Sequence, residues 1–190
     1  MNNQFKRSVK FSITIAVITF VLAAIFSMIS SSLLSQVNWG IGLFIVFLII
    51  SIGIVFDMLG IASTAADEAP FHAMASERVA GAREAVFIIR NADRFSSFSN
   101  DVIGDISGIV SGTATVFVVL QISYLLNHAE GTPIQIAFNV GFTSLVAALT
   151  VGGKAIGKYF AIHHSLQIIM FVGRCIAIIQ NRFKIKILPK

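Results

Sequence analysis

Four long apolar stretches constrain the fold of this chain more than any other feature of its sequence. They cover residues 11–34, 41–61, 97–126 and 133–153 of 190. A helix needs about 20 mostly apolar residues to cross the hydrocarbon core of a bilayer, and each stretch is long enough. Charged residues make up 12% of the chain, about half of what soluble domains contain. We therefore predict an all-α membrane protein with four transmembrane helices.

The basic residues predict how these helices are oriented. All 14 lysines and arginines lie before the first stretch, between the second and third, or after the fourth, and the connections 35–40 and 127–132 contain none. Because cytoplasmic loops of membrane proteins are rich in Lys and Arg, both termini are expected in the cytoplasm, in a multi-pass protein of the plasma membrane. Basic charge arranged by membrane side does not indicate a nucleic-acid partner. The first stretch exceeds the ~7–15 residues of a signal-peptide core, so we expect it to be retained.

Two cytoplasmic segments are expected to lie against the membrane surface. Residues 71–89 read FHAMASERVAGAREAVFII, within a predicted belt helix at 67–92, and their apolar positions recur roughly as on one helix face. Residues 162–181 are apolar but contain Gln167 and Arg174. Such composition is typical of amphipathic helices on a lipid surface. A fifth span over the second segment is the alternative, but Arg174 at its centre would cost about 2.5–3.5 kcal/mol.

Four ionisable residues fall in one layer of the predicted membrane region. At a rise of 1.5 Å per residue, Asp57 lies roughly 25 Å from the outer end of its span, and Asp101 and Asp105 lie roughly 6 and 12 Å from the cytoplasmic end of theirs. Lys154 follows the fourth stretch directly. All four are thus expected in the cytoplasmic third of the membrane. A charge near mid-bilayer costs about 2.5–3.5 kcal/mol, so such residues indicate either a site or an internal pair.

Structural explanations stay open beside the functional one. A carboxylate in the first turn of a helix, such as Asp101, is favoured by the helix dipole. Gly104, Gly108 and Gly112 form a small-residue stripe beside the aspartates, and such stripes are typical of close helix packing. Asp105 is the hardest residue to explain structurally, since it is expected to be deep and has no cation nearby in the sequence.

The chemistry of this layer suits a hard cation. Carboxylates, a hydroxyl such as that of Ser63 and a backbone carbonyl such as that of Gly153 are all oxygen ligands, which Mg²⁺ and Na⁺ prefer to nitrogen or sulfur. The sequence contains no recognisable set of nucleophile, base and orienting residue, so we do not expect an enzyme. The four histidines lack convincing ligand spacing, and the single cysteine, Cys175, excludes an intrachain disulfide.

Residues 73–109, AMASERVAGAREAVFIIRNADRFSSFSNDVIGDISGI, resemble the cytoplasmic helix and following span of the CNNM/CorC/CorB magnesium-transporter family. NADRF (91–95) stands where that family has an N-P-D-R-F-like turn, and IGD (103–105) stands where it has I-G-N. GKAIGK (153–158) takes the place of G-E-x-x-P-K, and DMLG (57–60) lies near the place of S-G-S-E.

This resemblance, which covers about 41–182, implies three spans with belt helices, a homodimer, and a Mg²⁺ site among the spans, with Na⁺-coupled export in some members. Three positions depart from the family pattern: its site asparagine is Asp105 here, its acidic residue in the last span is Lys154, and Asp57 lies near its serines. The family's nucleotide-sensing CBS domains are not expected after the fourth stretch. The expected organisation is an extra N-terminal transmembrane helix (1–36), a family-like membrane domain (37–182) with belt helices at 67–92 and 162–181, and a basic cytoplasmic tail (183–190).

Two functions are consistent with these residues, and a third uses the same carboxylates. The first is a divalent-cation transporter, for Mg²⁺ efflux or exchange, in which Asp57 and Asp105 bind the ion and Asp101 guides it in from the cytoplasm. The second is a non-transporting scaffold or regulator in which Lys154 pairs with an aspartate in place of the ion, beside a separate regulatory subunit. The third is a monovalent-cation or proton-coupled carrier. Contact between Lys154 and an aspartate would favour the second.

Overall fold

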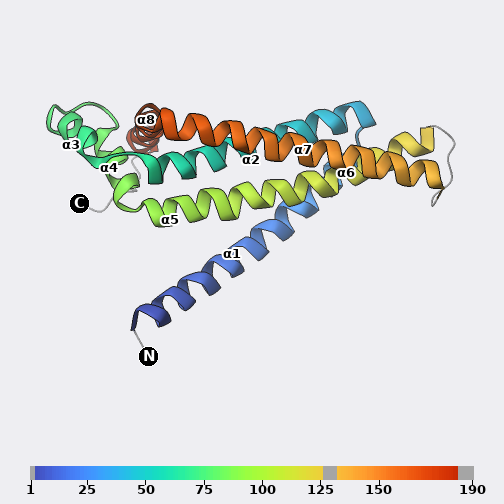
Figure 1. Ribbon diagram of the computed structural model, residues 1–190, viewed down its shortest axis with the longest axis horizontal. Coiled ribbons are helices and arrows are strands. Elements are labelled where there is room, and N and C mark those ends of the chain that lie inside the picture. Colours follow the sequence, from blue (N-terminus) through green and yellow to red (C-terminus); the bar gives the residue numbers. More distant parts are fainter. Residues whose placement is uncertain (1–2, 126–131, 184–190) are drawn as a thin grey trace. The chain divides into compact units, whose positions relative to one another are not determined.

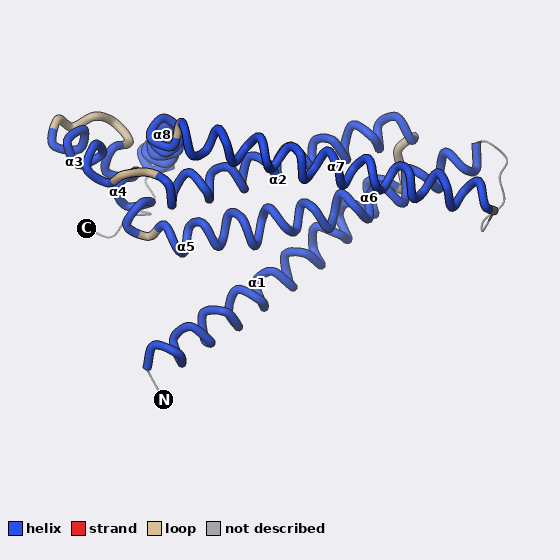
Figure 2. Tube along the Cα trace, viewed as in Figure 1, coloured by secondary structure: helices blue, strands red, loops and turns tan. Residues whose placement is uncertain are grey.

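The computed structural model describes residues 3–125 and 132–183, and within them the chain is helical without a strand (Figures 1 and 2). Its elements are α1 (Asn3–Leu34), α2 (Trp39–Ala65), α3 (Glu68–Ser76), α4 (Ala82–Arg90), α5 (Ala92–Ser96), the π-helix η1 (Ser97–Gly104), α6 (Asp105–Leu125), α7 (Pro133–His163) and α8 (Ser165–Phe183). The predicted all-α fold is thus confirmed. Residues 184–190 of the predicted tail, and His128 in the predicted turn before α7, lie outside the described residues.

Four of the described helical segments are long and apolar enough to cross a membrane. They are Ser8–Leu34, Trp39–Ala65, Ala92–Leu125 and Pro133–His163. The chain is therefore a multi-pass membrane protein with four spans, as predicted. Helix α8, which covers the second predicted belt segment, is not one of these four, so the described residues give no support to a fifth span.

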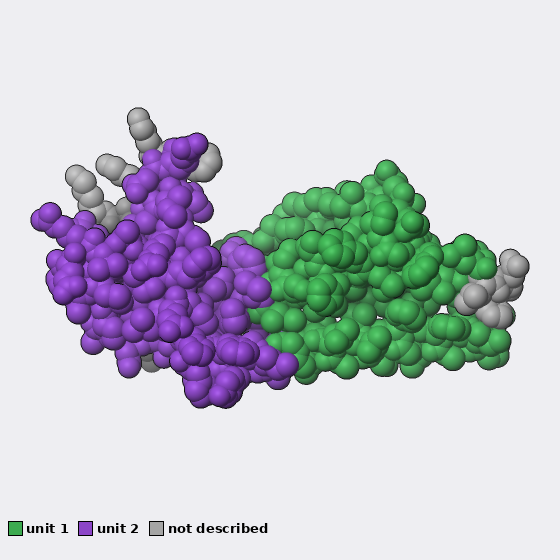
Figure 3. All heavy atoms as spheres, turned by 90° about the horizontal axis from the view of Figure 1, so that it is seen from above, with its two compact units in different colours: residues 1–54, 101–153 green, residues 55–100, 154–190 purple. Residues whose placement is uncertain are grey.

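The chain divides into two compact units, coloured separately in Figure 3. The first unit holds Met1–Ile54 and Asp101–Gly153, and the second holds Val55–Asn100 and Lys154–Lys190. The first unit therefore contains α1, α6 and the longer parts of α2 and α7. The second contains α3, α4, α5 and α8 with the last turns of α2 and α7.

In the first unit, α1 packs along the segment formed by η1 and α6. Val102, Ile106 and Val110 are at most 4% exposed and are contacted by Ile15 and Leu22 of α1. These three residues recur every fourth position, which places them on one face of the helix. The part of α1 that could cross a membrane, Ser8–Leu34, is mostly apolar and largely exposed, as expected of a helix whose surroundings are lipid.

Side-chain amides fix the connection between α1 and α2. Oδ1 of Asn38 accepts a hydrogen bond of 3.0 Å from the backbone N–H of Ile41, so Asn38 caps the start of α2. Nε2 of Gln121 donates to the carbonyl oxygens of Leu34 (3.1 Å) and Val37 (3.0 Å). The last carbonyls of a helix have no partner within it, so Gln121 satisfies groups at the end of α1 and ties that end to α6.

The close approach of α2 and α6 depends on a glycine that the sequence pattern did not single out. A Cβ at Gly53 of α2 would lie 2.8 Å from Cβ of Ser107 on α6, so only glycine fits there without a shift. By contrast, a Cβ at Gly108 or Gly112 would meet no atom within 4 Å. Within the described residues, the packing expected of this stripe is thus not seen at Gly108 and Gly112, whereas Gly104 is buried beside α2, with its carbonyl oxygen 3.5 Å from a Cβ placed at Gly53.

The first predicted belt helix is two helices in the structure. The predicted segment 71–89 is interrupted between α3 and α4, where Arg78 has φ 59° and Gly81 has φ 89°. These left-handed conformations end one helix before the next begins, and glycine adopts them at little cost. Gly81 also lies against α8, since a Cβ there would be 2.5 Å from the backbone nitrogen of Arg174. The prediction missed the break because the apolar spacing continues through it.

The second unit is held together by the packing of α3, α4 and α8. Phe71 of α3, Ala85 of α4 and Ile169 of α8 are fully buried in one cluster, which the last turns of α2 and α7 also join. On the other side of α8, Phe171 and Ile178 are 67% and 66% exposed. Helix α8 thus buries one face against protein and presents further apolar side chains outward, as the predicted surface helix would.

Candidate functional site

An ionic contact joins two of the predicted site residues. Nζ of Lys154 on α7 lies 3.7 Å from Oδ1 of Asp57 on α2, and their side chains are 25% and 14% exposed. Both residues belong to the second unit. The distance is longer than a direct hydrogen bond, so the contact is an ion pair between largely buried groups. The ammonium group of Lys154 thus provides the opposite charge that the Asp57 carboxylate needs in an apolar helix.

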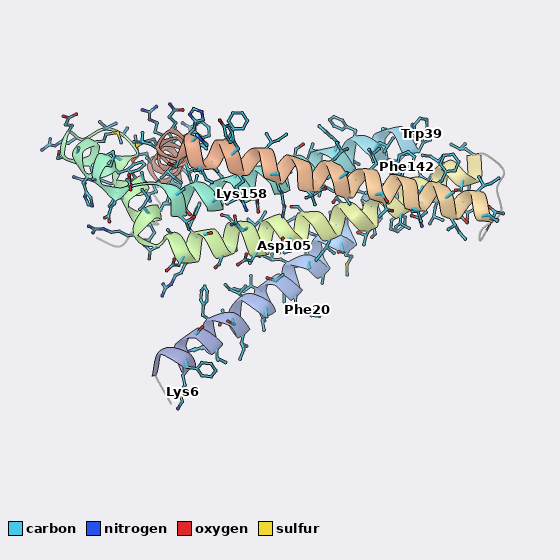
Figure 4. The ribbon with its side chains drawn as sticks, viewed as in Figure 1. Lys6, Phe20, Trp39, Asp105, Phe142 and Lys158 are labelled. Atoms are coloured by element: carbon cyan, nitrogen blue, oxygen red, sulfur yellow. The ribbon has the colours of Figure 1, made fainter. Side chains whose placement is uncertain are left out.

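Lys154 lies inside helix α7 rather than after its end. Helix α7 continues to His163, because nothing in the intervening segment interrupts helical geometry. A helix of 31 residues is about 46 Å long, whereas the hydrocarbon core is about 30 Å thick. Part of α7 therefore extends beyond the hydrocarbon, and Lys158, labelled in Figure 4, lies one turn after Lys154.

Two further predicted ligands are engaged in packing or in their own helix. The hydroxyl of Ser63 is buried and donates a 2.7 Å hydrogen bond to the carbonyl of Gly60 one turn earlier. Gly153 lies within α7, where a carbonyl ordinarily accepts from the N–H four residues later. A Cβ at Gly153 would overlap the side chain of Ile54, so this glycine has a packing role in the first unit.

Asp101 and Asp105 are both exposed on the helix that η1 and α6 form, and Asp105 is labelled in Figure 4. Val102 and Ile106, one position further along, are buried. The shared face that their spacing predicted is therefore present, although Asp101 belongs to a π-helical turn and Asp105 to the α-helix that follows. They lie in the first unit, whereas Asp57 and Lys154 lie in the second.

Across residues 3–125 and 132–183, no three His, Cys, Asp or Glu side chains lie close enough to hold one metal ion. The predicted ligand set differs from such a cluster, since it also drew on a hydroxyl and a backbone carbonyl. The Mg²⁺ or Na⁺ site therefore stays a prediction.

Comparison with known proteins leaves the family open. No protein-family model, characterised protein or solved structure matches this chain. The resemblance to the magnesium-transporter family thus stays a prediction, and it rests on residues 73–109 and the shorter segments at 57–60 and 153–158.

A polar cluster between α3 and α4 was not predicted. Oε1 of Glu68 lies 2.6 Å from Nε of Arg90, which donates to it, and 2.7 Å from Nε2 of His72. The hydrogen bonds from Arg90 and then His72 lower the pKa of the Glu68 carboxyl. The four-residue spacing of Glu68 and His72 on one helix could have indicated their contact. Nothing in the sequence indicated Arg90, because it comes from the next helix.

Two amides within the spans also went unnoticed. Gln121 holds the end of α1, as described above. The side chain of Asn100 lies against Gly60 of α2, where a Cβ would overlap it, and its Nδ2 donates a 3.4 Å hydrogen bond to Oγ of Ser96. A lone amide in an apolar stretch was the available signal, since an unpaired amide in hydrocarbon is costly.

Proposed function

We propose that this chain is a non-transporting membrane scaffold or regulator, in which the pair between Asp57 and Lys154 stands in place of an ion site. It lies in the plasma membrane with both termini in the cytoplasm. The observation that carries this proposal is the 3.7 Å contact between Nζ of Lys154 and Oδ1 of Asp57. The basic residues, which all lie in three of the five segments outside the four apolar stretches, support the orientation.

Charge and geometry both favour the pair over a magnesium ion. An ammonium group beside Asp57 neutralises the carboxylate, so a divalent cation would have to displace it or bind against its charge. Mg²⁺ requires near-octahedral oxygen ligands at about 2.0–2.1 Å. Ser63 directs its hydroxyl proton into its own helix, and Gly153 packs against Ile54. These residues therefore fit an ion pair that joins α2 to α7 better than a coordination site for Mg²⁺.

A double-mutant cycle tests the Asp57–Lys154 ion pair. Lys154→Met leaves Asp57 without this ammonium, and we expect it to lower the free energy of unfolding by about 1–3 kcal/mol, between the values for exposed and fully buried pairs. Asp57→Asn should cost a similar amount. The double variant should cost less than the sum of the two, because neither charge is then left alone. Thermal unfolding of the full chain in detergent measures all three.

The matched control is Lys158→Met, which removes an exposed lysine one turn further along α7. It should change stability little. Additive effects of Lys154→Met and Asp57→Asn on the free energy of unfolding would contradict an interaction between the two side chains. Mg²⁺ flux in proteoliposomes that contain the wild-type chain would contradict the non-transporting role directly.

Cation transport is the second candidate, and the exposed carboxylates of Asp101 and Asp105 favour it. Carboxylates within a span face a high cost in lipid, which an aqueous ion path would relieve. In that case Asp105→Asn should abolish Mg²⁺ flux while the chain still folds. Competition by Na⁺ would separate a monovalent-cation carrier from a divalent one.

A further inference from the structure

A cavity in the second unit is lined by none of the predicted site residues. Its volume is about 400 Å³, and it lies between α4, α5 and α8. Four apolar side chains form most of its wall: Phe87, Ile88, Phe95 and Ile176. A volume of this size falls within the range of about 300–1,000 Å³ typical of small-molecule sites.

The sequence position of its lining residues places this cavity at the membrane surface. Arg94 and Phe95 line it, and both belong to the first turns of the candidate span Ala92–Leu125. Residues at the end of a span lie near the lipid headgroups, where Arg side chains and aromatic rings are favoured. The molecules most abundant at this level are the phospholipids of the bilayer itself.

The residues that line the cavity include one basic and one acidic side chain. Arg94 and Glu84 are the charged residues among those that line the cavity, and the rest of its wall is almost entirely apolar. A guanidinium binds phosphate through charge-assisted hydrogen bonds, and a carboxylate accepts them from a primary ammonium. A headgroup that carries both a phosphate and a primary ammonium therefore complements this wall better than an anionic or a choline headgroup.

We propose that the cavity between α4, α5 and α8 binds one phospholipid with an ethanolamine headgroup. An acyl chain lies along Phe87, Phe95 and Ile176, the phosphate contacts Arg94, and the ammonium contacts Glu84. This inference does not depend on the proposed function, because it uses none of the residues of the Asp57–Lys154 pair. Either one can fail while the other stands.

The test is native mass spectrometry of the full chain in detergent, with phosphatidylethanolamine, phosphatidylglycerol or phosphatidylcholine added in equal amounts. We expect one tightly bound lipid per chain, with phosphatidylethanolamine preferred. Arg94→Gln should weaken its binding about tenfold, the effect of losing a hydrogen bond to a charged group. Glu84→Gln should shift the preference toward phosphatidylglycerol, since only the guanidinium charge then remains on the wall. Equal binding of all three lipids to the wild type would overturn the proposal.

The matched control is Arg83→Gln, which removes the same charge from α4 at an exposed position outside this cavity. This variant should leave lipid binding unchanged. An equal loss of lipid binding in Arg83→Gln and Arg94→Gln would mean that headgroups are attracted to basic residues anywhere on the surface, which would contradict a specific site. A second measurement uses tryptophan fluorescence and replaces aromatic side chains only by other aromatic side chains. Phe87→Trp in a Trp39→Phe background gives one tryptophan on the cavity wall. Phosphatidylethanolamine with brominated acyl chains should quench it more than the matching phosphatidylcholine, and equal quenching would count against the site.

Discussion

At the scale of single residues, two acidic side chains pair with basic side chains on other helices. Asp57 pairs with Lys154 across α2 and α7, and Glu68 pairs with Arg90 across α3 and α4. The sequence predicted the membrane layer of Asp57 and Lys154, because depth follows from helix rise. It left their contact open, since the rotation of two helices about their axes is set by packing that no local pattern contains. The contact of Glu68 with His72 was accessible, because both lie on one helix.

The Glu68 cluster should make stability depend on pH. Hydrogen bonds from Arg90 and His72 lower the pKa of folded Glu68 below its ordinary value near 4.5. A depressed carboxyl pKa stabilises the fold above the unfolded pKa, and this contribution is lost as pH falls through the folded pKa. Arg90→Gln should therefore lower the melting temperature at pH 7, and the difference from wild type should shrink as the pH drops from about 5 toward 3. Melting curves across this range, with Arg83→Gln as the control, measure it; a difference that is constant with pH would contradict the prediction.

At the scale of helices, apolar length predicted each span, whereas the ends and the contacts of helices were less accessible. Helix α7 runs past Gly153 to His163, because charged residues there do not end a helix. The predicted belt helix breaks before Gly81, where the backbone turns left-handed against α8. Both features have one reason for being hard to predict: the spacing of apolar residues reports which face is buried, but it does not report where a helix ends or the chain turns.

Glycines on two helices should respond oppositely to alanine. Gly53→Ala places a Cβ 2.8 Å from Ser107, so we expect a loss of about 1–3 kcal/mol from the forced separation of α2 and α6. Gly108→Ala meets no atom within 4 Å, and the higher helix propensity of alanine should stabilise α6 by about 0.5–1 kcal/mol. Unfolding of both variants in detergent compares them. Equal destabilisation would show that α6 is also packed through Gly108.

At the scale of the whole molecule, composition and charge were the most informative features. The four predicted spans are confirmed. A run of about 20 apolar residues is stable in few environments other than a membrane, which is why its length is informative. The division into two units was not predicted, since it depends on which helix segments pack together. Function was the least accessible, because the same few carboxylates are compatible with an ion path and with an internal pair.

Cysteine labelling tests the proposed orientation. In a Cys175→Ser background, Gln36→Cys places an exposed thiol in the connection between α1 and α2, and Glu77→Cys places one between α3 and α4. With both termini in the cytoplasm, a membrane-impermeant maleimide should label the first variant in intact cells and the second only after permeabilisation. The reverse pattern would mean that the chain is inverted in the membrane.

The amide of Gln121 has a consequence for the order in which the chain enters the membrane. Its partners, the carbonyls of Leu34 and Val37, are synthesised long before it. When the ribosome delivers α6 to the bilayer, α1 and the connection after it are therefore already present with these two acceptor carbonyls. Without α1, the third span would enter lipid with an amide that has no partner. A chain that lacks α1 should therefore insert its third span less efficiently than the full chain.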